Sequence, residues 1–260
     1  MTNIGTTSAA QQNYGSVKIL KPKYLFLNLL RMFQPVLVLD VGSMDGSDSI
    51  RFRQMSALSK IIAFEANPYN FSKMQSNPRL AAANIEVRNR MVSSKPEKGR
   101  FYISKGAVAG MNTGNMGMSS SMKPVNTLDV AEEIEVETVR LDDVIADSVS
   151  PADWAALWID VEGAAYEVLS SAARAKLQIA FLHIEVELAE YWVGQKLKHD
   201  VIQLANELGL LLIANSDNDK QQDLVFVNAR LLHDRATVVK WAVWLTEWFG
   251  PASSRLLAKI

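Results

Sequence analysis

Residues 36–47, VLVLDVGSMDGS, pass from an aliphatic run into a turn that contains two glycines. The run over 36–40 predicts a strand buried on both faces, and the pattern over 47–58 predicts a helix after the turn. A strand, a glycine turn and a helix N-terminus bring backbone N–H groups and the positive end of a helix dipole up to a ligand. The stretch therefore predicts the first strand of an open α/β sheet, with a ligand-binding turn at its end.

The same alternation continues along the chain. Amphipathic segments predict helices over 68–75, 162–176 and 195–208. Strands that are apolar on both faces and alternate with helices indicate a doubly wound α/β fold, in which a mostly parallel sheet is covered on both sides. Ligands bind such sheets at the carboxyl ends of the strands, so the polar residues there are the candidate site residues. The remaining predicted strands are 61–65, 85–90, 155–160, 180–187, 210–214 and 224–228.

No linker or internal repeat divides this pattern, so we expect a single domain over residues 1–260. We expect residues 1–18 to form a flexible tail, and residues 19–34 have the apolar spacing of an N-terminal helix. Residues 100–139 interrupt the alternation as an insertion, in which two β-like pieces, RFYIS and IEVETV, enclose a loop.

The loop of the insertion, residues 106–125, is rich in Gly, Met and Ser. A loop of about twenty residues inside a compact domain is usually functional or mobile. Short polar side chains suit the recognition of hydroxyl groups, so we interpret the insertion as a candidate substrate lid, with an ordinary flexible loop as the alternative. The polar candidates are Asn112, Asn115 and residues 119–121, and the methionines expected to pack the lid are Met111, Met116, Met118 and Met122.

The composition is that of a soluble globular protein, with 48% hydrophobic and 21% charged residues. The 27 basic and 28 acidic side chains nearly cancel, which disfavours nucleic acid as the main partner. The absence of cysteine excludes disulfides, thiolate zinc sites, iron–sulfur clusters and a cysteine nucleophile. The uncharged stretches 1–17 and 106–122 are too polar for a membrane span or a targeting signal, so we expect a cytoplasmic protein.

The turn itself indicates which ligand it binds. A dinucleotide fingerprint requires glycine where Met44 and Ser47 stand, so a pyrophosphate fits poorly. Asp40, just before the turn, favours a ligand with a cationic part, such as S-adenosylmethionine. Glu65 ends the next strand 23 residues after Gly42 (42 to 65), a spacing at which a carboxylate reaches ribose hydroxyls. The alternatives are a plain tight turn and a solvated carboxylate at the end of a strand.

A second group of carboxylates follows two later strands. Asp160 and Glu162 end one of them, and Glu185 and Glu187 end the next. Neighbouring strand ends lie about 5 Å apart, so these groups either hold a divalent cation such as magnesium or raise the pKa of one carboxyl enough for a general base. Asp160 and Glu185 are the catalytic candidates and the candidate metal ligands. His183 shares a face with Glu185 and is a third catalytic candidate.

Each of these assignments has a structural alternative. Glu162 would then only complement the N-terminus of its helix, and the glutamates of the later strand would pair with surface lysines. His183 would be a hydrogen-bonded core histidine. Two aromatic groups also stand out: Tyr191 and Trp192 are placed to stack on a sugar or on adenine.

A helical stripe near the C-terminus is expected to pack on the sheet, with a homodimer contact as the alternative. It consists of Val238, Trp241, Leu245 and Trp248, with Trp244 adjacent.

Five pieces of the chain, VLDVGSMDG, IIAFEANP, VRLDD, LWIDVEGAAYEVL and FLHIEVE, resemble the FkbM family of S-adenosylmethionine-dependent methyltransferases in their order and spacing. The resemblance covers about residues 36–187. It implies the Rossmann-like class I methyltransferase sheet, whose last strand is antiparallel. It also implies transfer of a methyl group to a hydroxyl of a sugar or glycosylated small molecule. The alternatives are a non-sugar metabolite hydroxyl as acceptor and a non-catalytic cofactor-binding homologue.

The resemblance also implies roles for individual residues. Asp40, Gly42 and Gly46 would face the methionine part of the cofactor, Glu65 would hold its ribose, and Asp160 would lie near the transferring methyl. The residues around 90–92 would flank the adenine. The full cofactor-binding set is Asp40, Gly42, Ser43, Gly46, Glu65, Ala66, Asn67, Met91, Val92 and Asp160.

This chain departs from the family pattern at three positions. Family members usually carry Asn where Met44 stands, Pro where Ala66 stands and Glu where Ala165 stands. The first two changes affect the shape of the turns. The third removes a polar partner from the helix beside Asp160, which weakens the case for a metal ion.

Overall fold

A computed structural model describes residues 21–95, 97–104, 107–108, 111–112, 119–125 and 130–249. Its centre is a seven-stranded sheet in the order β12-β13-β11-β10-β1-β2-β3. Strand β13 is antiparallel to both of its neighbours, and the other pairs are parallel. In spatial order the strands are β12 (Leu210–Asn215), β13 (Gln221–Asn228), β11 (Ile179–Glu187), β10 (Ala155–Ile159), β1 (Leu37–Val41), β2 (Lys60–Phe64) and β3 (Ile85–Arg88).

This sheet confirms the doubly wound, mostly parallel α/β fold, and the antiparallel strand that the family resemblance implied is β13. The chain order reverses at β1, which pairs with β2 on one side and with β10 on the other. The carboxyl ends of β1 and β10 therefore flank the position where open α/β sheets bind ligands.

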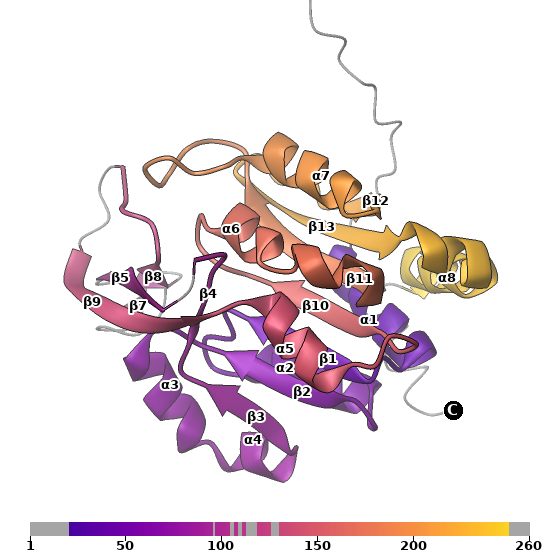
Figure 1. The fold of residues 1–260 in the computed structure, drawn as a ribbon, viewed down its shortest axis with the longest axis horizontal. Coiled ribbons are helices and arrows are strands. Elements are labelled where there is room, and N and C mark those ends of the chain that lie inside the picture. The colour runs from indigo at the N-terminus through magenta and orange to yellow at the C-terminus, as the bar shows by residue number, and fades with distance from the viewer. Residues whose placement is uncertain are drawn as a thin grey trace, which may run out of the picture.

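Helices cover both faces of the sheet (Figure 1). Those on one face are α5 (Leu141–Ser148), α6 (Ala165–Ser170) and α7 (Lys198–Glu207). Those on the other face are α1 (Pro22–Phe33), α2 (Ser47–Met55) and α8 (Ala229–Phe249). Three shorter elements complete the helices: α3 (Pro68–Gln75), α4 (Pro78–Ala82) and the 3-10 helix η1 (Ala173–Gln178).

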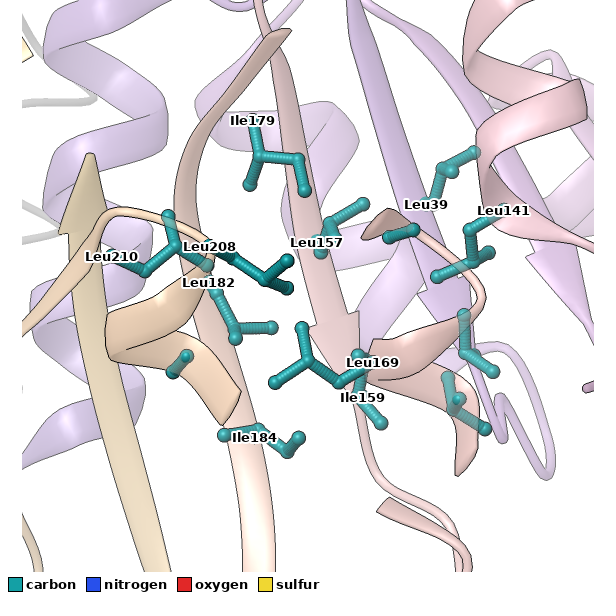
Figure 2. Close-up of a cluster of buried hydrophobic side chains, with 14 of the residues drawn as sticks. Leu39, Leu141, Leu157, Ile159, Leu169, Ile179, Leu182, Ile184, Leu208 and Leu210 are labelled. Atoms are coloured by element: carbon teal, nitrogen blue, oxygen red, sulfur yellow. The ribbon is translucent and has the colours of Figure 1, made fainter. Parts of the chain in front are cut away.

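The core is aliphatic on the face that α5, α6 and α7 cover. Leu39 and Leu157 from the strands cluster there with Leu141 and Leu169 from the helices, and all four are fully buried (Figure 2). Removing each such side chain from water contributes about 1.5–3 kcal/mol. The strands are apolar on both faces because the opposite face is buried too.

Aromatic rings fill the core on that opposite face. Phe26 of α1 packs edge-on against Phe52, Trp158 and Phe181, with ring centroids 5.2–5.5 Å apart. These contacts join α1, the helix expected over 19–34, to the sheet and to α2, together with the buried leucines of the same helix. Residues 19–20 and the tail over 1–18 lie outside the described residues.

The insertion forms a small sheet of its own. Its two β-like pieces are neighbouring antiparallel strands, and β4 adds to the second of them in parallel. Asn115, Met116 and Met118 of the predicted lid lie outside the described residues. The sheet consists of β4 (Met91–Val92), β9 (Val130–Val139), β5 (Lys98–Ser104) and β8 (Ser119–Ser120), while β6 (Ala107–Val108) and β7 (Met111–Asn112) pair with each other.

The predicted helix over 162–176 is interrupted after Ser170, and α5 was not predicted at all. One residue explains both differences. The Ser171 hydroxyl accepts a hydrogen bond from the Leu141 N–H at 3.2 Å, and the Ser171 carbonyl accepts one from the Asp142 N–H at 3.0 Å. Ser171 therefore supplies the N-terminal partners of α5, and the chain continues as η1 rather than as α6.

The aromatic stripe of α8 does not pack on the sheet as expected. Trp241 and Trp248 are 53% and 74% exposed, whereas Val239 and Ala242 are buried. The buried face is rotated from the predicted one, although Leu245 of the predicted stripe is buried as well. On this face the Asn28 side chain of α1 donates a hydrogen bond to the Thr246 hydroxyl at 2.8 Å. A contact between two copies of the chain through these tryptophans stays a prediction. None of the helices in the described ranges combines the length and apolar character needed to cross a membrane.

Candidate active site

The turn after β1 lies directly against the end of β10. Gly42 has a φ of +83°, and a Cβ atom at this position would lie 1.9 Å from the carbonyl oxygen of Asp160. The N–H groups of Gly42 and Ser43 both donate to the Phe64 carbonyl of β2 at 3.1 Å. The turn thus closes onto both neighbours of β1, and only glycine fits at its first position.

Two further residues of the turn have a left-handed backbone. Gly46 has a φ of +77° at the start of α2, where a Cβ atom would lie 2.7 Å from the Leu80 side chain. Met44 has a φ of +53°. Asn adopts this conformation more readily than Met, which explains why the family usually carries Asn there.

Asp40 lies beneath the turn. Its Oδ2 accepts hydrogen bonds from the Ser43 hydroxyl at 2.7 Å and from the Ser49 hydroxyl at 2.5 Å. Burial raises the pKa of Asp40 to about 6 against the effect of these bonds. Asp40 therefore stabilises the turn from the core side, and its contact with the cofactor stays a prediction.

Glu65 lies at the end of β2, on the other side of the turn. Its Oε2 accepts a hydrogen bond from the Met44 N–H, and its Oε1 accepts one from the Asn67 N–H, both at 2.7 Å. Burial raises the pKa of Glu65 to about 7. The carboxylate is held rigidly, with lone pairs left for a ligand hydroxyl.

Asn67 supports this corner and does not line the cleft. Its Oδ1 accepts from the Tyr69 N–H at 2.9 Å, which caps α3, and its Nδ2 donates to the Ser119 hydroxyl at 3.1 Å. The side chain of Asn89, which no sequence pattern indicates as a site residue, donates to the Glu65 carbonyl at 2.8 Å. The end of β2 is therefore fixed both to α3 and to the insertion.

A cleft of about 770 Å³, its opening to solvent included, lies between the ends of β1, β2 and β10 and the insertion. Its apolar lining includes Phe64, Met91, Val92 and Phe101, and this lining suits a flat heterocycle. Of the predicted cofactor residues, Asp40, Ser43, Gly46 and Asn67 act from behind the lining. The predicted cofactor residues that line the cleft are Gly42, Glu65, Ala66, Met91, Val92 and Asp160.

The insertion contributes part of the cleft wall. Phe101 of β5 and the run Ser119, Ser120 and Ser121 line the cleft beside the residues of the large sheet. Phe101 was not predicted, because nothing in the sequence shows that β5 folds back toward β2. Its only signal was its place in the β-like piece RFYIS.

Asp160 and Glu185 come together at the ends of neighbouring strands. They directly follow Ile159 and Ile184, which are partners in the parallel pairing of β10 with β11. Asp160 lines the cleft and its side chain is exposed there, while Glu185 is half-buried. Protein atoms around the carboxyl group of Asp160 displace part of its water, and this desolvation raises its pKa well above the usual range. The charge of Glu185 raises it further.

The pKa of Glu185 is raised to about 8 by burial, then by the charges of Glu162 and Asp223. Burial and the charge of Asp160 raise the pKa of Glu162 to about 7. Neither glutamate of β11 pairs with a lysine within the described part of the chain: Glu185 accepts from the Gln221 amide at 3.1 Å, and Glu187 from the Gly163 N–H at 2.9 Å. A group of carboxylates that shares protons near neutral pH is suited to act as a general base.

His183 lies in the core and not in the cleft. Its ring stacks on Trp158 at a centroid distance of 3.5 Å, and it is 1% exposed. Nε2 lies 3.3 Å from an Asp223 oxygen without hydrogen-bond geometry. Because burial lowers the pKa of His183, the ring is neutral near pH 7. The structure does not bring His183 to the reacting groups.

The described residues contain no group of three or more His, Asp or Glu side chains arranged to hold a metal ion. Asp160 and Glu185 therefore lack a third protein ligand for magnesium among those residues. Ala165, where the family usually carries Glu, is buried in α6. Trp192 is also buried and cannot stack on a ligand, whereas Tyr191 is 40% exposed.

Several known proteins are similar to this chain. The 2-O-methyltransferase NoeI of Sinorhizobium fredii is 26% identical over 225 residues, which cover 82% of this chain and 87% of NoeI. The solved methyltransferase FkbM from Methylobacillus flagellatus KT is 14% identical with a TM-score of 0.46, over 74% of this chain and 44% of that chain. This chain thus spans less than half of that protein's length.

A second solved structure is an O-methyltransferase from Bacillus cereus in complex with S-adenosylhomocysteine (SAH). It is 12% identical with a TM-score of 0.42, over 83% of this chain and 85% of that chain. A family model described as the Methyltransferase FkbM domain matches residues 40–211. Since this match spans more than half of the chain, the chain belongs to the FkbM family and is an S-adenosylmethionine-dependent methyltransferase.

Proposed function

We propose that this enzyme transfers the methyl group to a hydroxyl of a sugar or a glycosylated small molecule. The observation that carries the proposal is the pairing of Asp160 with Glu185 beside a cleft of suitable shape for adenosine. Hydroxyl acceptors need a base, because an alcohol is a weak nucleophile until its proton leaves. NoeI, a 2-O-methyltransferase by name, is consistent with an oxygen acceptor.

The residues of the cleft fit S-adenosylmethionine. The turn at Gly42 has no space for a side chain, and Gly42 and Glu65 both line the cleft. In this proposal the backbone of the turn contacts the cofactor, and Glu65 accepts hydrogen bonds from its ribose hydroxyls. Phe64 and Phe101, with Met91, give the adenine apolar surfaces. When bound, the cofactor supplies an electrophilic methyl group on a sulfonium.

Asp160 is proposed to accept the proton of the acceptor hydroxyl. Glu185 assists because its charge raises the pKa of Asp160, which makes the ionised carboxylate a stronger base. The remaining task of the protein is alignment, since holding two reactants in register contributes several kcal/mol toward the barrier.

The single domain over 1–260 and the lid role of 100–139 are part of this proposal. The support for it is that Ser119 and Ser121 of the insertion line the cleft, where we propose that they contact the acceptor. The hydroxyl of Ser120 is engaged elsewhere, because it donates to the Glu162 carbonyl at 2.6 Å. Ser121 is therefore the first proposed acceptor contact, and Ser119, whose hydroxyl accepts a hydrogen bond from the Asn67 side chain at 3.1 Å, keeps its own proton to donate to the acceptor.

Calorimetric titration with S-adenosylmethionine, SAH and NAD tests the cofactor. We expect the first two to bind; binding of NAD alone would contradict the proposal. Product analysis by mass spectrometry then tests the acceptor, using free sugars, nucleotide sugars, lipid-linked glycans and non-sugar polyketide alcohols. Methylation confined to the last class selects the non-sugar alternative, and cofactor binding without any product selects the non-catalytic one. A chelator arm tests for a metal ion.

A further inference from the structure

The carboxylate of Glu187 ends beneath the turn that follows β10, not in the cleft. Its Oε1 accepts a hydrogen bond from the Gly163 N–H at 2.9 Å, and the side chain is 2% exposed. Gly163 has a φ of +74° and precedes helix α6, so its N–H has no acceptor within the helix and depends on another partner. Glu187 supplies that partner from the neighbouring strand.

The opposite side of Gly163 is closed by Trp192. A Cβ atom on Gly163 would lie 2.3 Å from Cδ1 of the indole. Trp192 is fully buried. Its backbone forms a β-bridge with Pro124 of the insertion, and its backbone N–H donates a hydrogen bond to the Gln195 side chain. Gly163 is therefore held between a hydrogen bond on one side and an aromatic ring on the other.

The rest of this turn, residues 160–163, is held equally firmly. The Asp160 N–H donates to the Val41 carbonyl at 2.9 Å, and the Glu162 carbonyl accepts from the Ser120 hydroxyl at 2.6 Å. The side chains of Asp160 and Glu162, by contrast, line the cleft. The backbone is thus fixed so that these two carboxylates face the ligand.

We propose that Glu187 is a positioning residue for methyl transfer, which fixes the wall of the cleft at residues 160–163 through the Gly163 N–H. The Gly163 N–H requires an acceptor oxygen at the end of a side chain as long as glutamate. A negative charge is not required, since Glu187 pairs with no Lys or Arg within the described residues. Glutamine has the same reach and an acceptor oxygen. Aspartate keeps the charge but is shorter by one C–C bond, about 1.5 Å.

Two substitutions distinguish the effect of side-chain length from that of charge: Glu187→Gln keeps the length, and Glu187→Asp keeps the charge. We expect E187Q to bind SAH within about twofold of the parent and E187D to bind about tenfold more weakly, because a displaced turn spoils the cleft wall. Calorimetry with SAH measures this without any acceptor. In protein labelled with ¹⁵N-glycine, we expect the Gly163 amide signal to move far upfield in E187D and much less in E187Q.

Asn228→Ala is the matched control. Asn228 is a buried side chain that donates to the Ile179 carbonyl at 2.9 Å, at the other end of β11. We expect N228A to lower the melting temperature while SAH affinity stays at the parent value. A general loss of stability would weaken SAH binding in N228A as well.

The inference rests on the proposed function only for the role of Asp160 as base. With an acceptor from the screen, we expect E187D to lower kcat about a hundredfold with little change in acceptor KM, and E187Q to restore kcat. If no acceptor is methylated, the proposed function fails while the SAH titration still decides the role of Glu187. The inference is overturned if folded E187Q binds SAH weakly, or if E187D binds SAH as tightly as the parent. If E187D does not fold, the SAH affinity of E187Q decides.

Discussion

The Cα atom of Gly42 lies against the carbonyl oxygen of Asp160, so close that a side chain at Gly42 would overlap it. Gly42 begins the turn that is proposed to carry the cofactor, and Asp160 is the proposed base. The two functions therefore depend on one backbone contact between the ends of β1 and β10, and a change at either residue affects the position of the other.

We expect Gly42→Ala to weaken SAH binding more than tenfold, because the new methyl would lie 1.9 Å from the Asp160 carbonyl and must displace it. Calorimetry with SAH measures the effect. Gly209→Ala is the control, since Gly209 has a similar φ of +78° but no atom within 4 Å of an added Cβ. G209A reports the cost of backbone strain alone. Parent-like affinity in G42A would show that the turn does not carry the cofactor.

Asp160→Asn is expected to lower kcat at least a hundredfold, because the amide cannot accept the proton of the acceptor hydroxyl. SAH affinity should change little, since Asn keeps the size of the side chain and the backbone contacts of the turn. Rates of SAH formation and calorimetry measure the two quantities on the same preparation. Unchanged turnover would remove Asp160 from the mechanism.

The rate is expected to rise with pH through an apparent pKa well above the usual carboxylate range. The base works only when ionised, and the pKa of Asp160 is raised by desolvation at the cleft wall and then by the charge of Glu185, whose own pKa is raised to about 8. In Glu185→Gln the neighbouring charge is gone, so the acidic limb of kcat/KM should move to lower pH. Glu207→Gln, on the exposed surface of α7, should leave the profile unchanged. An E185Q profile that coincides with the parent profile would contradict the coupling.

Phe26→Ala is expected to destabilise the protein by about 3–5 kcal/mol, because Phe26 contacts three aromatic rings of the core and its removal leaves a cavity. Urea unfolding measures the free energy. Leu58→Ala, at a residue 91% exposed, should cost less than about 0.5 kcal/mol. Equal effects of the two substitutions would mean that α1 is not anchored through Phe26.

The strands and the acidic residues at their ends were predictable because both depend on local pattern. A run such as VLVLD is apolar on both faces only if both are buried, and Asp160 and Glu185 fall at strand ends by counting. The supports of the site were not predictable, because they join distant segments. Asn89 on the Glu65 carbonyl and Trp192 on Gly163 depend on how loops meet in space, and no spacing in the sequence encodes that.

Strand β13 pairs with β11 on one side and β12 on the other, so the final strand of the described residues enters the sheet between two strands that precede it in the chain. Until residues 221–228 are synthesised, the edge of β11 opposite β10 and the edge of β12 that faces β13 lack their final partner. A nascent chain at that stage exposes open strand edges, which promote association with other chains. Chaperone demand during translation is therefore expected to peak just before β13 emerges.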